Sequence, residues 1–327
     1  MKNPERPELA FLARPEFIAG RLLPALPPAL RALADRPEVR QIDTEDPEKM
    51  TAVYRLADGT RLYAKVYQEE AAGQHCATVL RQLRDHGFAD DAPYRVPEPL
   101  AYLTQERVLV MTEAQGVNLN DYLGTNSAAQ RAGMQEAARW LVRLHTAPIQ
   151  VGTPAPYWEH FFKLARRTAK AVERRPAWAE RVVDLLDRLA PLAQEAADRP
   201  LVQTHGQFRD LHLYLAPDGV TAIDFDRSRP ADPSADLDEF VHRLRWKTFK
   251  HYHDRPDELT GAFLEEYARL APPGSLRNLS YYAAYRTLYS LIGLLRSRDD
   301  DVTWEEEVAF HLDDYEAALA GRFLPRL

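Results

Sequence analysis

The segment from Leu201 to Leu237 constrains the fold of this 327-residue chain more than any other part of its sequence. It holds two strand-like runs, LVQTH and LHLYLAPDGVTAIDFD, and Asp218-Gly219 divides the second run with a dipeptide typical of a hairpin turn. After Leu237 the apolar residues recur at helical spacing. The segment therefore predicts a short strand arrangement that leads into a helical C-terminal part.

The segment from Val39 to Ala114 has the pattern of an antiparallel sheet. The runs VRQID, MTAVYRLADG and TRLYAKVYQ indicate a meander with a turn at Asp58-Gly59, and VPEPLAYL and ERVLVMTEA indicate two further strands. A helix over about 71–86 separates the two groups. In the third strand, alternation places Lys65 on the face opposite the apolar residues Leu62, Ala64 and Val66.

The strand pattern changes to a helical one near residues 112–118, and this change predicts the organisation of the chain. We expect residues 1–38 to form a proline-interrupted helical extension, 39–114 a strand-rich part, and 115–327 a mostly helical part. In the helical part, Ser127 is a candidate cap for the helix that follows it.

Composition narrows the class of protein. The formal net charge of -7 argues against a dedicated nucleic-acid binder. The single cysteine, Cys76, excludes an intramolecular disulfide and a cysteine-based metal cluster. No apolar run approaches the ~20 residues of a membrane helix, and the N-terminus lacks the apolar core of a signal peptide. We therefore expect a cytoplasmic protein without nucleic-acid or membrane partners.

The motifs between Leu201 and Leu237 resemble the catalytic core of the aminoglycoside phosphotransferase and choline kinase families. The family core reads His-Gly-Asp, four residues, Asn, then a strand ending in Ile-Asp-Phe or Ile-Asp-Trp, and then Gly/Ala-Asp-Pro-x-x-Asp-Leu. This chain matches it, in the same order and at the same spacing, at His205-Gly206, Ile223-Asp224-Phe225, Ala231-Asp232-Pro233 and Asp236-Leu237.

The resemblance extends less specifically over roughly residues 39 to 320. Lys65 stands where the family places a phosphate-orienting lysine on its third strand. VLVMTEAQG resembles the hinge that joins the two lobes, from Met111 to Ala114, and Glu113 and Ala114 there would offer backbone groups to an adenine. The resemblance implies an α+β, bilobal, protein-kinase-like fold, with a five-stranded antiparallel sheet plus one helix followed by a mostly helical lobe.

The same resemblance implies ATP and Mg²⁺ as cofactors. Phosphoryl transfer depends on charge neutralisation and positioning, so it needs a cation on the phosphates and oxygen ligands for the metal. Lys65 would pair with the phosphates and Asp224 would bind the metal, with Asp226 adding a second carboxylate. His205 is expected chiefly to bond the backbone of the catalytic loop, and Asp236 to brace this loop and cap the helix that follows.

Four departures from the family pattern put catalysis in question. Gln207 stands in place of the catalytic aspartate, and an amide cannot take a proton at neutral pH. His212 stands in place of the metal-binding asparagine, and imidazole suits magnesium less well than oxygen does. The helix over 71–86 offers no evident glutamate to pair with Lys65, and the loop TEDPEKM has no glycine and three acidic residues.

These departures leave three functions open. The first is an ATP-dependent phosphotransferase acting on a hydroxyl of a small molecule, in which Asp210 replaces the missing base or little base assistance is needed. The second is a catalytically inactive, pseudokinase-like protein that binds a nucleotide, metabolite or partner. The third is a kinase fold that transfers another group, such as a nucleotidyl. The acidic run RDDDVTWEEE would suit a cationic acceptor, and otherwise indicates a solvated loop and helix start.

Overall fold

The computed structural model describes residues 9–34, 37–42, 50–123, 128–196, 200–252, 257–297 and 303–323. The chain divides into two compact units: Met1–Gly116 with Tyr214–Asp226, and Val117–Leu213 with Arg227–Leu327. We call them the sheet unit and the helical unit. The hairpin that precedes Asp224 therefore belongs with the N-terminal part of the chain, which ends at Gly116.

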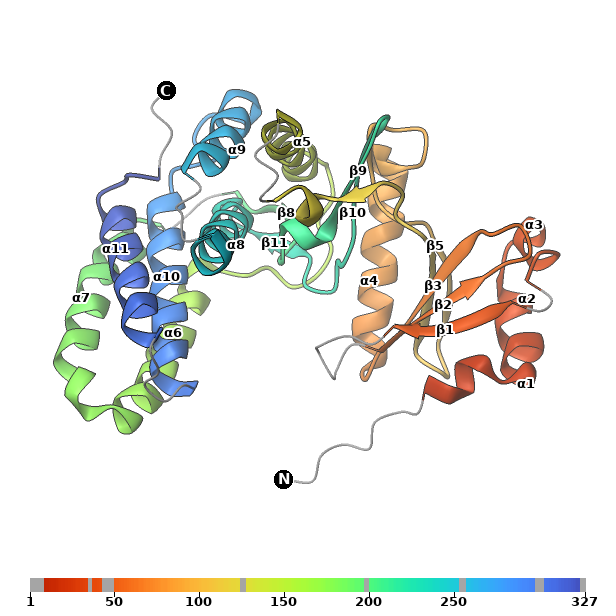
Figure 1. The fold of residues 1–327 in the computed structure, drawn as a ribbon, viewed down its shortest axis with the longest axis horizontal. Coiled ribbons are helices and arrows are strands. Elements are labelled where there is room, and N and C mark those ends of the chain that lie inside the picture. The colour runs from red at the N-terminus through yellow and green to blue at the C-terminus, as the bar shows by residue number, and fades with distance from the viewer. Residues whose placement is uncertain are drawn as a thin grey trace. The chain divides into compact units, whose positions relative to one another are not determined.

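The sheet unit is built on a five-stranded antiparallel sheet with the strand order β1-β2-β3-β6-β5 (Figure 1). The strands β2 and β3 are joined by the predicted turn, in which the Thr60 amide donates to the Asp58 carboxylate at 2.9 Å and Gly59 takes a positive φ of 89°. Five strands and one helix were predicted for this region, and the structure confirms them. The strands are β1 (Glu38–Ile42), β2 (Met50–Arg55), β3 (Arg61–Val66), β5 (Pro99–Leu103) and β6 (Val108–Thr112).

One face of this sheet is covered by the N-terminal residues. Leu62, Ala64 and Val66 are buried on that face, as the alternation predicts, and they share a core with apolar side chains of residues 12–34. The Tyr54 hydroxyl donates to the Leu12 carbonyl at 2.7 Å and ties the two layers together. The covering segment is a chain of short helical pieces: η1 (Leu9–Ala13), α1 (Pro15–Phe17), η2 (Ile18–Leu22), α2 (Leu23–Ala25) and α3 (Pro28–Arg31).

The helix α4 (Glu70–Leu83) follows β3 and packs closely on β5. A Cβ added at Gly73 would lie 2.4 Å from the Tyr102 ring, so a larger residue there would require the Tyr102 side chain to shift. The helix continues as a π-helical turn, η3 (Arg84–Phe88), whose residue Gly87 has a φ of 89°. The predicted helix thus ends within a few residues of its expected boundary.

The hairpin of the sheet unit is formed by β9 (Leu213–Ala216) and β10 (Gly219–Ala222). β10 pairs in parallel with the short strand β4 (Tyr94–Arg95), and Arg95 binds the turn residue Asp218 at 2.7 Å. A Cβ at Gly219 would lie 2.1 Å from the Pro93 carbonyl oxygen. These contacts hold the strand that ends before Asp224 against the N-terminal part of the chain.

The helical unit has its core around α10, which packs against α6, α7, α8 and α11, while α5 packs against α9 (Figure 1). The predicted cap Ser127 lies outside the described residues. No described helix is long and apolar enough to span a membrane. The helices are η4 (Leu119–Tyr122), α5 (Ala128–His145), α6 (Tyr157–Arg174), η5 (Pro176–Trp178), α7 (Ala179–Glu195), η6 (Asp210–His212), α8 (Ser234–Tyr252), α9 (Asp257–Leu270), α10 (Leu279–Ser297) and α11 (Trp304–Leu319), with the short strands β7 (Val117–Asn118), β8 (Val202–Thr204) and β11 (Arg229–Ala231).

Buried histidines make this unit sensitive to acid. Burial lowers the pKa of His160 and His311 to about 4, and it lowers the pKa of His242 well below the ordinary value. The His311 ring stacks on Trp246 with 4.7 Å between ring centroids. A neutral histidine buried in this way stabilises the fold above the unfolded-state pKa near 6.5, and the stabilisation is lost as the pH falls toward 4.

We predict that His311→Phe flattens the dependence of stability on pH. The variant keeps an aromatic ring beside Trp246 but has no group to protonate. At pH 5 the free energy of unfolding of the wild type should have fallen by about 2 kcal/mol on account of His311 alone, and the variant should be spared this loss. Urea denaturation at pH 7 and pH 5 measures it. Equal losses in the two proteins would contradict the assignment.

Candidate active site

Lys65 is the centre of a largely buried ion cluster within the sheet unit, in which each side chain keeps some exposure. Its Nζ lies 2.7 Å from Asp224 Oδ1 and also contacts the carboxylate of Asp226. The Tyr67 hydroxyl donates to the other oxygen of Asp226 at 2.9 Å. β3 supplies Lys65 and the chain just after it supplies Tyr67, while the segment after β10 supplies the two aspartates. The structure therefore brings together three residues that sequence analysis predicted to act on phosphates and metal.

Burial and the neighbouring charges have opposite effects on the pKa of Lys65. Burial lowers the pKa of its ammonium, but Asp224 and Asp226 outweigh burial and leave this pKa raised, so Lys65 carries a positive charge. On α4, Cys76 lies close enough to interact electrostatically with Lys65, and burial raises the pKa of its thiol to about 12. A neutral thiol thus lies near the lysine, where sequence analysis sought an acidic partner on α4. The acidic partners are Asp224 and Asp226 instead.

The backbone at Asp224 is strained. Its φ of 71° lies in the left-handed region, which residues other than glycine rarely adopt. Strain of this kind costs of order 1–3 kcal/mol and persists where the surrounding structure enforces it, most often at functional sites. Here the enforcing contacts are the bond to Lys65 and the pairing of β10 with β4.

The two carboxylates fit a magnesium ion that is shared with a phosphate. Mg²⁺ in nucleotide sites is held by one or two carboxylates, and the substrate phosphates and waters complete its shell. Asp224 and Asp226 meet that requirement with oxygen ligands. Within the described ranges, no group of three or more His, Cys, Asp or Glu side chains is arranged to hold a metal without such help.

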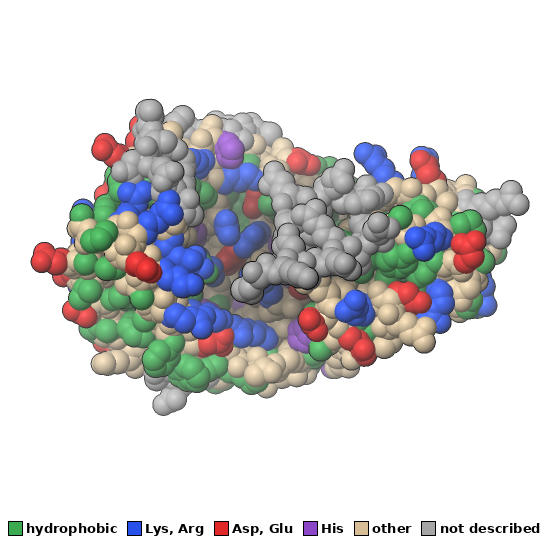
Figure 2. Space-filling view, turned by 90° about the horizontal axis from the view of Figure 1, so that it is seen from below, with side chains coloured by type: hydrophobic (Ala, Val, Ile, Leu, Met, Phe, Trp, Pro, Cys, Tyr) green, Lys and Arg blue, Asp and Glu red, His purple; other side chains and the backbone are tan. Residues whose placement is uncertain are grey.

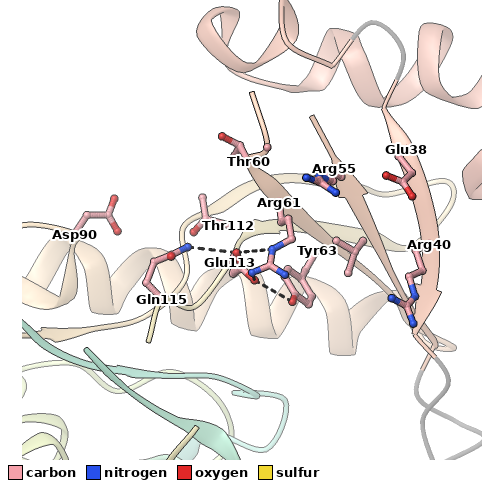
Figure 3. Close-up of a pocket in the computed structure, with 12 residues that line it drawn as sticks. Glu38, Arg40, Arg55, Thr60, Arg61, Tyr63, Asp90, Thr112, Glu113 and Gln115 are labelled. Atoms are coloured by element: carbon pink, nitrogen blue, oxygen red, sulfur yellow. Dashed lines mark hydrogen bonds and ion pairs between the residues drawn. The ribbon is translucent and has the colours of Figure 1, made fainter. Parts of the chain in front are cut away.

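A cavity of about 1180 Å³ opens over the sheet, on the face that carries Lys65 (Figure 3). Glu113 lines it and binds Arg61 at 2.7 Å, and the Tyr63 hydroxyl donates to the same carboxylate at 3.3 Å. Met111 pairs with Tyr63 across β6 and β3. The cavity is lined by Glu38, Arg40, Val53, Arg55, Gly59, Thr60, Arg61, Tyr63, Asp90, Thr112, Glu113 and Gln115.

Of the predicted nucleotide residues, Glu113 lines the cavity. Met111 lies within β6, and Glu113 and Ala114 follow this strand directly, at the edge of the cavity that Glu113 lines. The loop TEDPEKM, which was expected to approach phosphates poorly, lies almost entirely outside the described residues.

The loop after β8 in the helical unit is braced by Asp236. Its carboxylate accepts the amide of His205 at 2.6 Å and the amide of Gly206 at 2.8 Å, and it also contacts His145 Nε2 at 3.2 Å. Gly206 has a φ of 79°, and a Cβ there would lie 2.1 Å from the Arg227 carbonyl oxygen. The predicted bracing role of Asp236 is confirmed.

The predicted capping role of Asp236 is wrong. Helix α8 begins at Ser234, two residues before Asp236, and the Ser234 amide donates to the Asp232 carboxylate at 2.8 Å. Asp232 therefore caps this helix. Its other carboxylate oxygen accepts from the Asn278 amide at 2.6 Å.

The three predicted catalytic-loop residues are all engaged in contacts of the helical unit. The backbone amide of Gln207 donates to His205 Nδ1 at 3.3 Å, which is the structural role expected for that histidine. The backbone carbonyl of Gln207 contacts His212 Nδ1 at 2.8 Å. Asp210 is buried, and Lys247 on α8 binds its carboxylate at 3.0 Å. The Lys247 ammonium therefore occupies one oxygen of the Asp210 carboxylate.

Sequence analysis missed two partners in these clusters. Tyr67 shares the strand face of Lys65 by simple alternation, and its spacing is a signal that could have assigned it to the site. Lys247 gave no local signal, since it meets Asp210 only through the packing of α8, 37 residues further along the chain.

Comparison with known proteins settles the family. The profile of the phosphotransferase enzyme family matches residues 21–286. This chain belongs to that family. No curated protein matches it in sequence.

Solved structures confirm the kinase-like α+β fold. Choline kinase from Cryptosporidium parvum Iowa II is 13% identical, with a TM-score of 0.66, over 95% of this chain and 98% of that one. A choline/ethanolamine kinase family protein from Mesorhizobium loti is 15% identical, with a TM-score of 0.60, over 93% and 98%. The ADP-bound aminoglycoside phosphotransferase APH(2'')-Ib is 15% identical, with a TM-score of 0.58, over 86% and 94%.

We predict that the loop after β8 depends on the Asp236 carboxylate for its stability. Asp236→Ala leaves two buried backbone amides without their acceptor, so the free energy of unfolding should fall by about 3 kcal/mol. Urea denaturation measures this change. Asp218→Ala, which removes an exposed carboxylate paired with Arg95, is the matched control and should change stability little. A loss no larger than that of the control would contradict the bracing role.

Proposed function

We propose that this protein is an ATP-dependent phosphotransferase that acts on a hydroxyl of a small molecule and uses Mg²⁺. The observation that carries the proposal is the buried cluster of Lys65 with Asp224 and Asp226. Family membership supports small-molecule phosphotransfer in general terms. The use of ATP and the nature of the acceptor are our inferences.

The sheet unit supplies the residues for the nucleotide. Lys65 would donate to the phosphate oxygens, and Asp224 and Asp226 would hold the Mg²⁺ that neutralises them. The backbone at Glu113 and Ala114 would bond the adenine at the end of the cavity over the sheet. The strained, fixed Asp224 reduces the reorganisation needed when these ligands bind, because its carboxylate is already placed.

The helical unit supplies a weakened set of residues for the acceptor. The Gln207 carboxamide would accept a hydrogen bond from the acceptor hydroxyl and orient it, but it would leave the proton in place. The loose transition state of phosphoryl transfer asks for little early proton transfer, so orientation alone supports a slow reaction. Asp210 would serve as base only after giving up its contact with Lys247.

We predict that ATP with Mg²⁺ raises the melting temperature of the wild-type protein. A ligand that binds only the folded state adds about 2.7 kcal/mol of stability at a hundredfold excess over its dissociation constant. Lys65→Ala and Asp224→Ala should both abolish the rise, whereas Lys170→Ala, an exposed lysine of the helical unit, should keep it. The absence of any rise at millimolar ATP would refute nucleotide binding.

A second function is favoured by the contacts of the loop. Position 207 carries an amide side chain, Lys247 pairs with Asp210, and His212 contacts the backbone carbonyl of Gln207. These are features of an inactive nucleotide-binding relative. Such a protein would show the ATP-dependent rise in melting temperature without turnover. A kinase fold that transfers a nucleotidyl group would instead release pyrophosphate, which separates it from the other two.

We predict that Gln207→Asp accelerates the production of ADP from ATP in the presence of small-molecule alcohols. A positioned general base is worth typically 10²–10⁴-fold, and the loop backbone that would hold it is already braced. Gln207→Asn is the matched control and should give no gain. If Asp210 is the working base, Asp210→Asn should abolish turnover in the wild type. An unaffected turnover rate in Asp210→Asn would exclude Asp210 as the catalytic base.

A further inference from the structure

Three guanidinium groups surround one carboxylate beside the catalytic loop of the helical unit. Arg209, Arg243 and Arg286 contact Glu239 at 2.6, 3.4 and 2.8 Å. Arg286 also binds Asp238 at 3.0 Å. Arg209 lies two residues after Gln207, Arg243 and the two acids lie on α8, and Arg286 lies on α10. The group contains three cations and two carboxylates, so it has an excess of positive charge.

The excess charge acts on the residues of the group. Burial lowers the pKa of Arg243, and the neighbouring Arg209 and Arg286 lower it further, as like charges crowded together must. Glu239 opposes this crowding, at 3.4 Å from the Arg243 Nε. The Arg243 side chain is still 46% exposed, so it remains accessible to a ligand from solvent.

A second set of cations lies near Arg286. On α6, Glu159 lies between Lys163, at 2.5 Å, and Arg229, at 3.4 Å. Burial lowers the pKa of His160, and the charges of Arg286, Lys163 and Arg229 lower it further, so all three cations act on one imidazole. The His160 Nδ1 is buried and has no hydrogen-bond partner among the described residues.

Cations are also visible on the surface of this unit. Figure 2 shows several Lys and Arg side chains gathered on the helical unit, at the left of the view, with some Asp and Glu side chains among them. Arg229 lies on β11, where it pairs with Thr204 just before the catalytic loop. Cations of the loop, α8 and α10 therefore meet at Glu239, and cations of α6, β11 and α10 act on His160, with Arg286 common to both groups.

We propose that the helical unit binds an oxyanion, a carboxylate or a phosphate, through Arg209, Arg243 and Arg286. The inference rests on the proposed function and specifies its acceptor as a small-molecule alcohol that carries a negative group. Guanidinium pairs the two oxygens of such a group with two parallel N–H donors, so the site selects for an oxyanion over a neutral or cationic acceptor.

The negative charge proposed here for the acceptor is opposite to the positive charge that the acidic run RDDDVTWEEE suggested. Within that run, Glu307 is buried and its carboxylate binds Lys250, so it is not available to a cationic ligand. The residues 298–302 lie outside the described part of the chain. The described charges next to the loop therefore favour an anionic acceptor.

Titration of inorganic phosphate and of succinate, with choline as the cationic probe, tests the inference by calorimetry at constant ionic strength. We expect the wild type to bind at least one of the two anions and not choline. Preference for phosphate would indicate a phosphorylated acceptor, and preference for succinate a carboxylated one. Arg243→Gln and Arg209→Gln should each weaken anion binding about tenfold, since each removes a charge-assisted hydrogen bond.

Arg269→Gln is the matched control, because Arg269 is likewise an exposed arginine paired with a glutamate one turn away on a helix of the same unit. It should leave anion binding unchanged. Choline binding, or anion binding equal in all the variants, would overturn the inference.

A further variant separates this inference from the proposed function. Lys65→Ala should lose the ATP-dependent rise in melting temperature and keep anion binding, because the oxyanion residues all lie in the helical unit. If Lys65→Ala loses phosphate binding while Arg243→Gln keeps it, the anion occupies the nucleotide site and the inference fails with the proposed function intact. If ATP has no effect on the wild type but the arginine variants lose anion binding, the proposed function fails and the anion site stands.

Discussion

The ion cluster of Lys65 with Asp224 and Asp226 is the constraint on which the sheet unit depends. It joins a strand near residue 65 to a segment about 160 residues later, and so fixes the hairpin of β9 and β10 to the N-terminal sheet. Burying one ammonium with two carboxylates is costly unless each charge keeps a partner, and here each does, with Tyr67 completing the set. This cost of burial is understandable at a site where a phosphate can replace the aspartates as partners of Lys65, and a divalent ion can replace Lys65 as partner of the aspartates.

A different constraint holds the helical unit. Asp236 binds the backbone amides of His205 and Gly206, so the loop is shaped by contacts that do not involve the side chain at position 207. Trp140 and Phe208 stack beneath it with 5.7 Å between ring centroids. The loop geometry therefore belongs to the backbone and the core, whatever residue is presented to the acceptor.

Local patterns in the sequence were enough to predict most of the fold. Alternation identified the buried face of β3, and Asp58-Gly59 identified its turn, because both depend on residues close together in the chain. The partners of the charged residues were harder to predict. Lys247 meets Asp210, and Arg286 meets Glu239, only after distant helices pack, and neither pair has a periodic signal. The same limit explains why the acidic run suggested a cationic acceptor, whereas the shared contact of Arg209, Arg243 and Arg286 with Glu239 was not predicted.

Two departures from the family pattern, at positions 207 and 212, lie in the helical unit, whereas Lys65, Asp224 and Asp226 of the sheet unit are all present. This asymmetry follows from the two constraints. Changing Lys65 or Asp224 would leave a buried charge without its partner, which is strongly destabilising. Changing the residue at 207 removes no brace, since the Asp236 contacts are made to backbone amides that every residue type but proline provides. The fold thus protects the nucleotide residues and leaves the base position open to substitution, so Gln207 by itself does not imply that nucleotide binding has been lost.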